Sequence, residues 1–408
     1  MPLRLLTALV LLTALAVAAG CRGPANTSAA QPPGAATTAA QPTARTAAAT
    51  PALREVTDMA GRTVKIPATI RKIYTAQPYT TVLLYVVAPD LMVGMQPGCL
   101  PLREEDKRFL CKEVANLPMV STQAPGGEKA QVNMEAILAL KPDLALAMGG
   151  GTGGPMGGAK GKASPTTGEP KGPPMGQGKA KGKGGPPRMV DQFAKIGLPV
   201  VMVDIDSISD YPAGIEFLGK LLGREERAQR LSAYAVQVFA DVGKMVAAIP
   251  PEKRVRVYYA ESADGLATES DRSLHADAIR MAGGNIVHKG ELKTHQGMEK
   301  VSLEQVLLYN PEVIISQEKA FADFAYHDPR WQKVKAVTNH RIYTVPRTPY
   351  NWIDRPPGIM RIIGVQWLAN RFYPDRCYKT DIGERIREFH RLFMGVEVTD
   401  KDLDEWLS

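Results

Sequence analysis

The sequence predicts an α/β protein built as two Rossmann-like lobes, each with a mostly parallel sheet, joined by one long helix. Three observations lead to this fold class. Strand-like and helix-like segments alternate in both halves of the chain, a long helical pattern separates the halves, and one segment of the first half recurs in the second. With 408 residues, of which 44% are hydrophobic and 23% charged, the chain is long enough for two cores plus extensions.

The N-terminus has the pattern of an export signal. Arg4 precedes an apolar run over residues 5–17, and small residues follow at 18–20. The run is too short to span a bilayer comfortably. We therefore expect a signal peptide over residues 1–20 that is removed from the mature protein.

Cys21, directly after Ala-Ala-Gly, resembles the lipobox of bacterial lipoproteins, and this resemblance implies that its thiol is acylated. The alternative is ordinary cleavage near Ala19. Residues 21–53 are almost all Ala, Thr, Pro, Gln and Gly, which cannot bury enough apolar surface to become ordered. They read as a disordered tether between a membrane and the folded part.

We assign the N-terminal lobe to residues 54–205. It opens with two short alternating runs within 54–67, about Ala60-Gly61, which predict a hairpin. Strand-like and helix-like segments then alternate, which favours βα units on a mostly parallel sheet. These segments are 72–76, 80–88, 91–95, 134–140, 144–148, 189–196 and 200–203.

A disordered insertion interrupts this lobe over residues 149–188. Gly, Pro and Lys dominate it, and no hydrophobic periodicity survives there. Its seven Lys and Arg residues stand against a single Glu, so it supplies most of the formal net charge of +8. The basic composition therefore says little about the folded lobes, and we expect no nucleic-acid partner.

The linker between the lobes, residues 206–250, contains the long helix. Apolar residues recur there in steps of three and four and form one continuous stripe, which predicts an amphipathic helix that stops at Pro250-Pro251. A second alternating α/β block follows, and we assign residues 251–408 to the C-terminal lobe. The stripe consists of Ala228, Leu231, Ala235, Val238, Val242, Met245 and Ile249.

An internal repeat is the most informative feature of the sequence. Residues 132–146 align without gaps on residues 301–315. Each copy reads as an N-cap (Asn133 or Ser302), a short helix, a turn containing Pro and an acid, and a buried strand. The chain therefore looks like two similar lobes, each carrying one copy.

Two lobes joined by a long helix behind an export signal resemble the substrate-binding proteins of ABC importers for iron-siderophores, haem and cobalamin. The start of the folded region at 55–64 and both copies of the repeat look like motifs of that family, and the similarity covers about residues 54–148 and 189–375. The resemblance implies a shallow ligand cleft between the lobes and a linking helix that limits hinge motion. It also implies an ABC permease in the cytoplasmic membrane as partner.

In that family, a glutamate on each lobe docks against arginines of the permease. The resemblance places this role on Glu135 and Glu304, which stand at equivalent positions of the two repeat copies. An acid in the first turn of a helix is also favoured by the helix dipole, by about 0.3–1 kcal/mol, without any partner. The recurrence in both lobes leads us to expect docking.

Ligands of α/β sheets gather at the loops beyond the carboxyl ends of the strands. This rule nominates Tyr79 and Gln96 in the first lobe, and Glu261 and Arg272 in the second. Tyr79 could act as a phenol donor or metal ligand, or it could pack over the helix that begins near Thr80.

Residues 348–358 form the loop richest in aromatic and polar groups. The loop resembles the Trp-bearing loop with which the cobalamin binders of this family contact their ligand. Our candidates are Tyr350 and Trp352, which offer flat apolar area, and Asp354 and Arg355, of which Arg355 offers a bidentate fork for a carboxylate or oxyanion. Two alternatives remain: Trp352 is a partly buried packing residue, and Asp354-Arg355 is an ion pair that fixes the loop.

The positions of the histidines and cysteines limit the metal sites and disulfides that we expect. All six histidines follow residue 270, so we do not expect a bare ion clamped by His from both lobes, and we assign no metal site and no cofactor. His275, His288 and His295 could still add a ligand to a metal that arrives chelated. Cys99 and Cys111 lie close together in an exported, oxidising setting; they form a local disulfide or remain independent thiols.

Together these features predict a monomeric, lipid-anchored solute-binding protein of the periplasm or cell surface. We expect it to deliver an iron chelate of the siderophore type, or a related metal complex, to an ABC permease. A corrinoid, an oxyanion such as molybdate or tungstate, and a nickel or cobalt chelate are alternative ligands. A non-transport surface sensor lipoprotein and an exported enzyme are alternative classes. The sequence contains no G-x-S-x-G, H-E-x-x-H or G-x-x-x-x-G-K-[ST] motif, so we do not expect an enzyme.

Overall fold

The computed structural model describes residues 52–96, 104–120, 134–148, 189–291, 297–377 and 381–407, which belong to one compact unit, Pro51–Ser408. The signal peptide, Cys21, Cys99 and the insertion at 149–188 lie outside the described residues, so the expectations for them stay predictions. Within the described ranges, no helix combines the length and the apolarity that crossing a bilayer requires.

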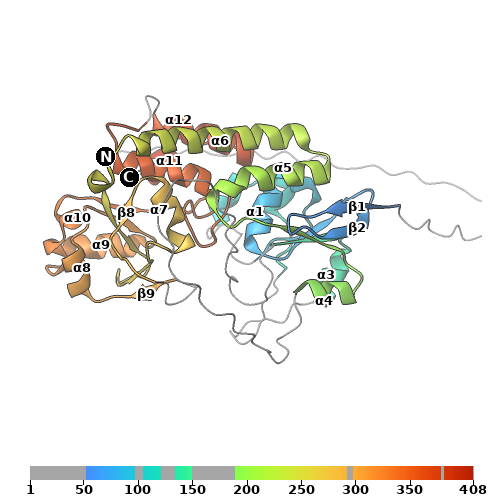
Figure 1. Cartoon of the computed structure of the whole chain (residues 1–408), viewed down its shortest axis with the longest axis horizontal. Helices are drawn as coiled ribbons and strands as arrows, with labels where there is room; N and C mark the ends of the chain where they lie inside the picture. The colour runs from blue at the N-terminus through green and yellow to red at the C-terminus, as the bar shows by residue number, and fades with distance from the viewer. Residues whose placement is uncertain are drawn as a thin grey trace, which may run out of the picture. The chain divides into compact units, whose positions relative to one another are not determined.

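The first lobe is built on a three-stranded parallel sheet of order β3-β4-β5 (Figure 1). The predicted hairpin precedes it, with β1 (Leu53–Thr57) antiparallel to β2 (Thr63–Pro67). The strands of the sheet are β3 (Ile73–Thr75), β4 (Leu144–Met148) and β5 (Val200–Val203). Nearly every residue of β4 and β5 is buried, as their unbroken apolar sequences predict. The helices of this lobe are α1 (Pro78–Val87), α2 (Lys112–Ala115), α3 (Met134–Leu140) and α4 (Met189–Lys195).

The second lobe has a four-stranded parallel sheet of order β11-β10-β6-β8. Its strands are β6 (Arg256–Ala260), β8 (Asn285–Ile286), β10 (Val313–Ser316) and β11 (Ile342–Thr344). A short antiparallel pair, β7 (Ala267–Thr268) and β9 (Glu299–Lys300), lies beyond the carboxyl end of β6. The helices are α7 (Asp277–Met281), α8 (Leu303–Tyr309), α9 (Lys319–His327) and α10 (Lys335–Thr338).

The two lobes repeat one unit, as the sequence repeat predicts. α3 leads into β4, which lies between β3 and β5, and α8 leads into β10, which lies between β6 and β11. The registers correspond as well, because Leu144 pairs with Ile73 at the start of β4 and Val313 pairs with Val257 at the start of β10. The two-lobed α/β fold class is therefore confirmed.

A long helix, α6 (Glu225–Ala247), links the lobes and packs along α5 (Tyr211–Leu222) and α11 (Arg361–Phe372) (Figure 1). Gly223, with φ of 66°, ends α5 and permits the tight turn into α6. Most of the predicted apolar stripe is buried, and the helix ends shortly before Pro250-Pro251, where no helical hydrogen bond can continue. The linking helix is therefore confirmed.

The end of the chain returns to the first lobe. After α12 (Ile382–Phe389) and a π-helical turn at His390–Met394, the carbonyl oxygen of Met394 accepts a hydrogen bond from the Tyr85 hydroxyl at 3.0 Å. In α13 (Asp400–Leu407), Asp402 pairs with Arg108 and Trp406 packs on Phe109. The C-terminal lobe that we assigned to 251–408 is thus not a separate body, because its last helices share a core with the first lobe.

Cys111 is a free, half-buried thiol in the structure, and burial raises its pKa. Cys99 lies outside the described residues, so the pairing of the two cysteines stays a prediction.

Candidate ligand-binding site

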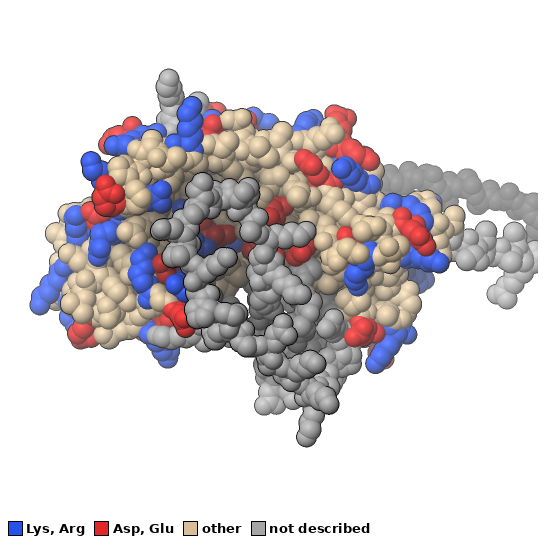
Figure 2. Space-filling view, in the orientation of Figure 1, with Lys and Arg blue, Asp and Glu red and all other residues tan. Residues whose placement is uncertain are grey.

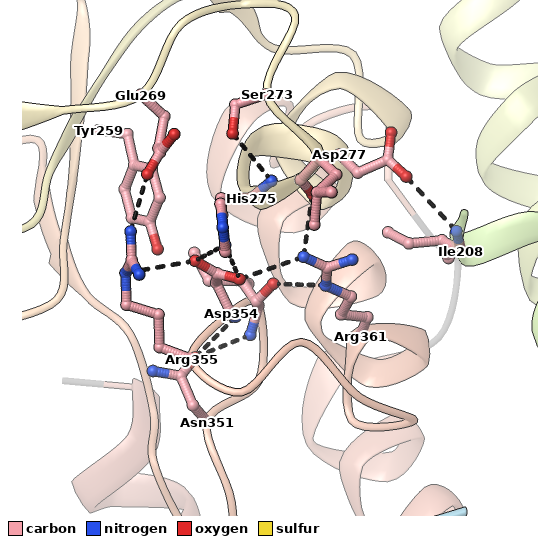
Figure 3. A network of polar contacts seen from close by, with 12 residues as sticks. Ile208, Tyr259, Glu269, Ser273, His275, Asp277, Asn351, Asp354, Arg355 and Arg361 are labelled. Carbon is pink, nitrogen blue, oxygen red and sulfur yellow. Dashed lines mark hydrogen bonds and ion pairs between the residues drawn. The ribbon is translucent and has the colours of Figure 1, made fainter. Parts of the chain in front are cut away.

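Arg355 is the centre of a polar network in the second lobe (Figure 3). Its Nε donates to Glu261 Oε1 and its Nη2 donates to Glu269 Oε1, both at 2.8 Å. The two glutamate side chains have no exposed surface, whereas the Arg355 side chain keeps 29% of its surface exposed. Glu261 directly follows β6 and Glu269 follows β7, so the two acids lie behind the guanidinium and hold it toward solvent.

Burial sets the charge state of Glu261. Burial and the neighbouring Glu269 raise the pKa of Glu261 to about 9, although the Arg355 guanidinium opposes this. Glu261 is therefore protonated at neutral pH.

Asp354 organises the second half of the network. Its carboxylate is fully buried, contacts His275 Nδ1 at 2.8 and 2.9 Å, and accepts from Arg361 Nη2 at 3.2 Å. Asn351 Oδ1 accepts from the backbone N–H of Asp354 at 2.9 Å and fixes the loop around it. In the view of Figure 3, Arg355 and Arg361 lie on opposite sides of Asp354.

The backbone of Arg355 adopts a φ of 57°, in the left-handed region that non-glycine residues rarely occupy. A residue is held in such a conformation only when its surroundings fix it, and such residues cluster at functional sites. Here the fixing groups are the two buried glutamates and Asp354, whose Oδ2 lies 3.5 Å from Arg355 Nε. The guanidinium is therefore pre-positioned.

The first lobe contributes Tyr79, in the first turn of α1. Burial raises the pKa of Tyr79 to about 12, and the charges of Arg361, Asp354 and Arg355 act on the phenol as well. The phenol therefore lies within electrostatic reach of the second lobe's network and remains a neutral hydrogen-bond donor. Contact of Tyr79 with a ligand stays a prediction. Figure 2 shows acidic side chains in the hollow between the two lobes.

The structure corrects the expectation for the two aromatic residues of the 348–358 loop. Trp352 has no exposed surface; its Nε1 donates to the Thr348 carbonyl oxygen at 3.0 Å, and its ring packs edge-on against Trp406 at 5.5 Å. Tyr350 is also buried, with its ring edge-on to Tyr85 at 6.3 Å. Neither ring can offer a face to a ligand, so the packing alternative for Trp352 is the correct one.

The structure also shows the surroundings of four further candidates. Gln96 is buried within the first lobe, where its Nε2 donates to the Tyr74 hydroxyl at 2.9 Å. Arg272 is exposed, and its contact with a ligand stays a prediction. Glu261 and Asp354 belong to the network, but as fully buried partners that position Arg355 and His275.

Arg361 is the network residue that sequence reasoning missed. It stands in an apolar run, Ile359-Met360-Arg361-Ile362-Ile363, at the start of a buried helix. A charge in such a run must be paired inside the protein, because burying it alone costs several kcal/mol, on the order of a full ion-desolvation penalty. This conflict between charge and surroundings is the signal that could have found it.

The two predicted docking acids lie on equivalent helices. Glu135 is exposed in the first turn of α3, and Glu304 is exposed in the first turn of α8. Backbone N–H groups and the Ser302 side chain lower the pKa of Glu304, so this carboxylate is charged at neutral pH. The position of both acids agrees with the expectation, whereas docking itself stays a prediction.

Known proteins are similar to this chain in sequence and in fold. The family model described as "Periplasmic binding protein" matches residues 183–349. An ABC transporter solute binding protein from Sulfurospirillum deleyianum is 32% identical, and its structure superposes with a TM-score of 0.71 over 86% of this chain and 98% of that chain.

Two curated relatives are more distant. The molybdate-binding protein MolA of Haemophilus influenzae is 22% identical over 365 residues, which are 83% of this chain and 90% of that protein. The vitamin B12-binding protein of Vibrio cholerae is 24% identical over 227 residues, which are 55% of this chain and 66% of that protein. With the duplicated fold, these similarities show that the chain belongs to the periplasmic binding proteins and is a substrate-binding protein of an ABC transporter.

Proposed function

We propose that this protein captures an anionic metal chelate, of the iron-siderophore type, between its lobes and delivers it to an ABC permease. The observation that carries the proposal is the pre-positioned guanidinium of Arg355, fixed by two buried glutamates, whose charge acts on the Tyr79 phenol of the other lobe. A planar guanidinium and a neutral phenol are both hydrogen-bond donors, and this pair suits the oxygen-rich surface of such a chelate.

His275 favours a ligand that contains a metal. Because its Nδ1 contacts the buried Asp354 carboxylate, Nε2 is the nitrogen that remains for a further partner. A histidine held by a carboxylate in this way is typical of metal-bound imidazole. One imidazole and one phenol supply too few ligands for a bare ion, but they suit an ion that keeps most of its own chelator.

A molybdate-type oxyanion is the second candidate ligand. The relative MolA is named as a molybdate-binding protein and aligns with most of the chain. A small oxyanion would use the same Arg355 donors but would leave His275 without a metal to bind. We therefore rank it second.

Delivery requires contact with the permease, and we assign this contact to Glu135 and Glu304. Both are exposed and charged side chains at equivalent places of the duplicated unit. A lipid on Cys21 would hold the mature protein at the membrane, in the periplasm or at the cell surface, and acyl chains contribute about 0.8 kcal/mol per buried CH₂ to such an anchor. The tether that follows Cys21 would let the folded unit reach the permease.

Isothermal titration calorimetry with defined ligands tests the proposal. We expect a ferric catecholate or ferric hydroxamate to bind, and Arg355→Gln to weaken that binding at least tenfold. The control is Arg376→Gln, which changes an exposed arginine that follows α11 and should leave binding unchanged. Binding of molybdate but of neither chelate would favour the second candidate. Binding of cobalamin, or of none of these ligands, would refute the assignment of ligand class.

A further inference from the structure

We propose that each lobe adds an apolar anchor to its docking acid. Leu138 beside Glu135 and Leu308 beside Glu304 form two matching patches, the docking patches, that fit one partner: the membrane-embedded part of the ABC permease. The inference rests on the proposed delivery to a permease and extends it, because the sequence had nominated only the acids for this contact.

Both leucines are exposed on helices whose other face is buried. Leu308 exposes 79% of its surface and Leu138 exposes 47%, and among the described large apolar side chains Leu308 is the most exposed. In the same helices Val306 and Ile137 are completely buried and attach the helix to its lobe. Single exposed apolar residues are common on protein surfaces, so exposure alone does not carry the proposal.

The recurrence of an acid and a leucine in both lobes carries it. Leu138 follows Glu135 by three positions and Leu308 follows Glu304 by four, so in each helix the leucine lies one turn from the acid on the same face. The acids align in the gapless repeat, whereas the two leucines are one position apart in it, because Leu138 aligns with Leu307 and Leu308 aligns with Ala139. The two helices hold the same place in the duplicated unit, directly before β4 and β10. In Figure 1 both lie on the side of the molecule away from α6.

The patch on α8 is rigidly supported at both ends of the helix. At the N-terminus, Ser302 Oγ accepts a hydrogen bond from the Gln305 N–H at 3.2 Å. At the C-terminus, the Tyr309 hydroxyl bonds to His288 Nδ1 at 2.8 Å, and His288 Nε2 contacts the buried Glu299 carboxylate at 3.0 Å. A surface fixed in this way loses little conformational freedom when a partner binds.

The chemistry of the docking patches defines the partner. A carboxylate next to an exposed leucine is complementary to an Arg or Lys next to a small apolar pocket, and a buried apolar anchor inside a polar rim is the usual composition of a binding hot spot. Two patches of the same composition, with their acids at equivalent positions, fit a partner that presents two similar sites. A permease of two identical or similar halves has this symmetry, whereas a lipid surface offers no such pair of sites.

The test uses the full-length chain in its native cells. A photoreactive benzoylphenylalanine is placed at position 138, 308 or 236, and the cross-linked products are identified by mass spectrometry. Val236 is the matched control because it is 53% exposed but lies on α6. We expect positions 138 and 308 to cross-link to the same permease and position 236 not to do so.

Binding to that permease in lipid nanodiscs is then measured for Leu138→Asn, Leu308→Asn, Val236→Asn, Glu135→Gln and Glu304→Gln. Each leucine variant should weaken binding about tenfold, with the Val236 variant unchanged and all melting temperatures preserved. If the glutamate variants weaken binding and the leucine variants do not, the apolar anchors are refuted while the proposed docking stands. If all four patch variants bind like the wild type, the proposed docking fails too, and cross-linking to a second copy of this chain would also overturn the inference.

Discussion

At acidic pH the folded protein should lose stability through one buried histidine, His390. Its ring stacks on Trp406 with centroids 5.1 Å apart, and the rings of Phe109 and Trp352 lie at 6.4 and 5.8 Å. Nδ1 bonds to the Ile386 carbonyl oxygen at 2.8 Å. Burial among these rings lowers the pKa of His390 from 6.5 to about 4, because the charged imidazolium cannot be solvated there.

The sign and size of the effect follow from this pKa. Between pH 6.5 and 4 the unfolded chain binds a proton at His390 that the folded protein does not bind, so stability is complete above pH 6.5 and falls as the pH approaches 4. At pH 5 the unfolded histidine is almost fully protonated and the folded one is almost neutral. The difference removes about 2 kcal/mol from the free energy of unfolding relative to pH 7.5.

Urea denaturation of wild type and His390→Phe at pH 7.5 and pH 5.0 measures this contribution. The variant is expected to lose about 2 kcal/mol less than the wild type over this interval, because it lacks the titrating group. The control is His327→Phe, since the His327 Nδ1 also bonds to a carbonyl oxygen four residues earlier, at 2.7 Å, but its side chain is exposed. An identical pH dependence of wild type and His390→Phe would refute the reasoning.

Three further changes test the packing and the polar network. Arg355→Met removes the cation next to the buried carboxyl groups of Glu261 and Glu269 and should lower the free energy of unfolding, measured by urea denaturation at pH 7, by about 3 kcal/mol. Adding Glu269→Gln to this variant should restore part of the lost stability, and no restoration would refute the pairing of Arg355 with Glu269. Gly364→Ala should lower stability by about 2–3 kcal/mol, because a Cβ there overlaps the backbone carbonyl of Trp352. Gly243→Ala, by contrast, should raise stability by about 0.5–1 kcal/mol in thermal unfolding, because a Cβ at this exposed position of α6 meets no atom within 4 Å. Equal effects of the Gly364 and Gly243 changes would contradict the packing around α11.

The sequence was most informative where hydrophobic periodicity repeats. The apolar runs at Leu144–Met148 and Val200–Val203 coincide with β4 and β5, because a strand buried on both faces requires an unbroken apolar run. The repeat located α3 and α8 for the same reason, since a duplicated unit keeps its pattern of buried positions. These features are local, and local features can be read from one sequence.

The candidate site was predictable only in part, because its geometry depends on contacts between distant segments. Arg355 and Tyr79 were found by the rule that ligands gather beyond strand ends, which uses chain order alone. The burial of Trp352 depends on Trp406, which comes from the last helix of the chain. No local pattern announces such a contact, so an exposed and a buried tryptophan look alike in the sequence.

The two lobes share a unit but contribute unequally to the site. The second lobe supplies Arg355, His275 and the buried carboxyls that fix them, whereas the described part of the first lobe supplies Tyr79. Because Nε and Nη2 of Arg355 already donate to Glu261 and Glu269, a ligand must compete with these two side chains for the Arg355 donors. Selection therefore depends on geometry and on the number of oxygen acceptors more than on total ligand charge.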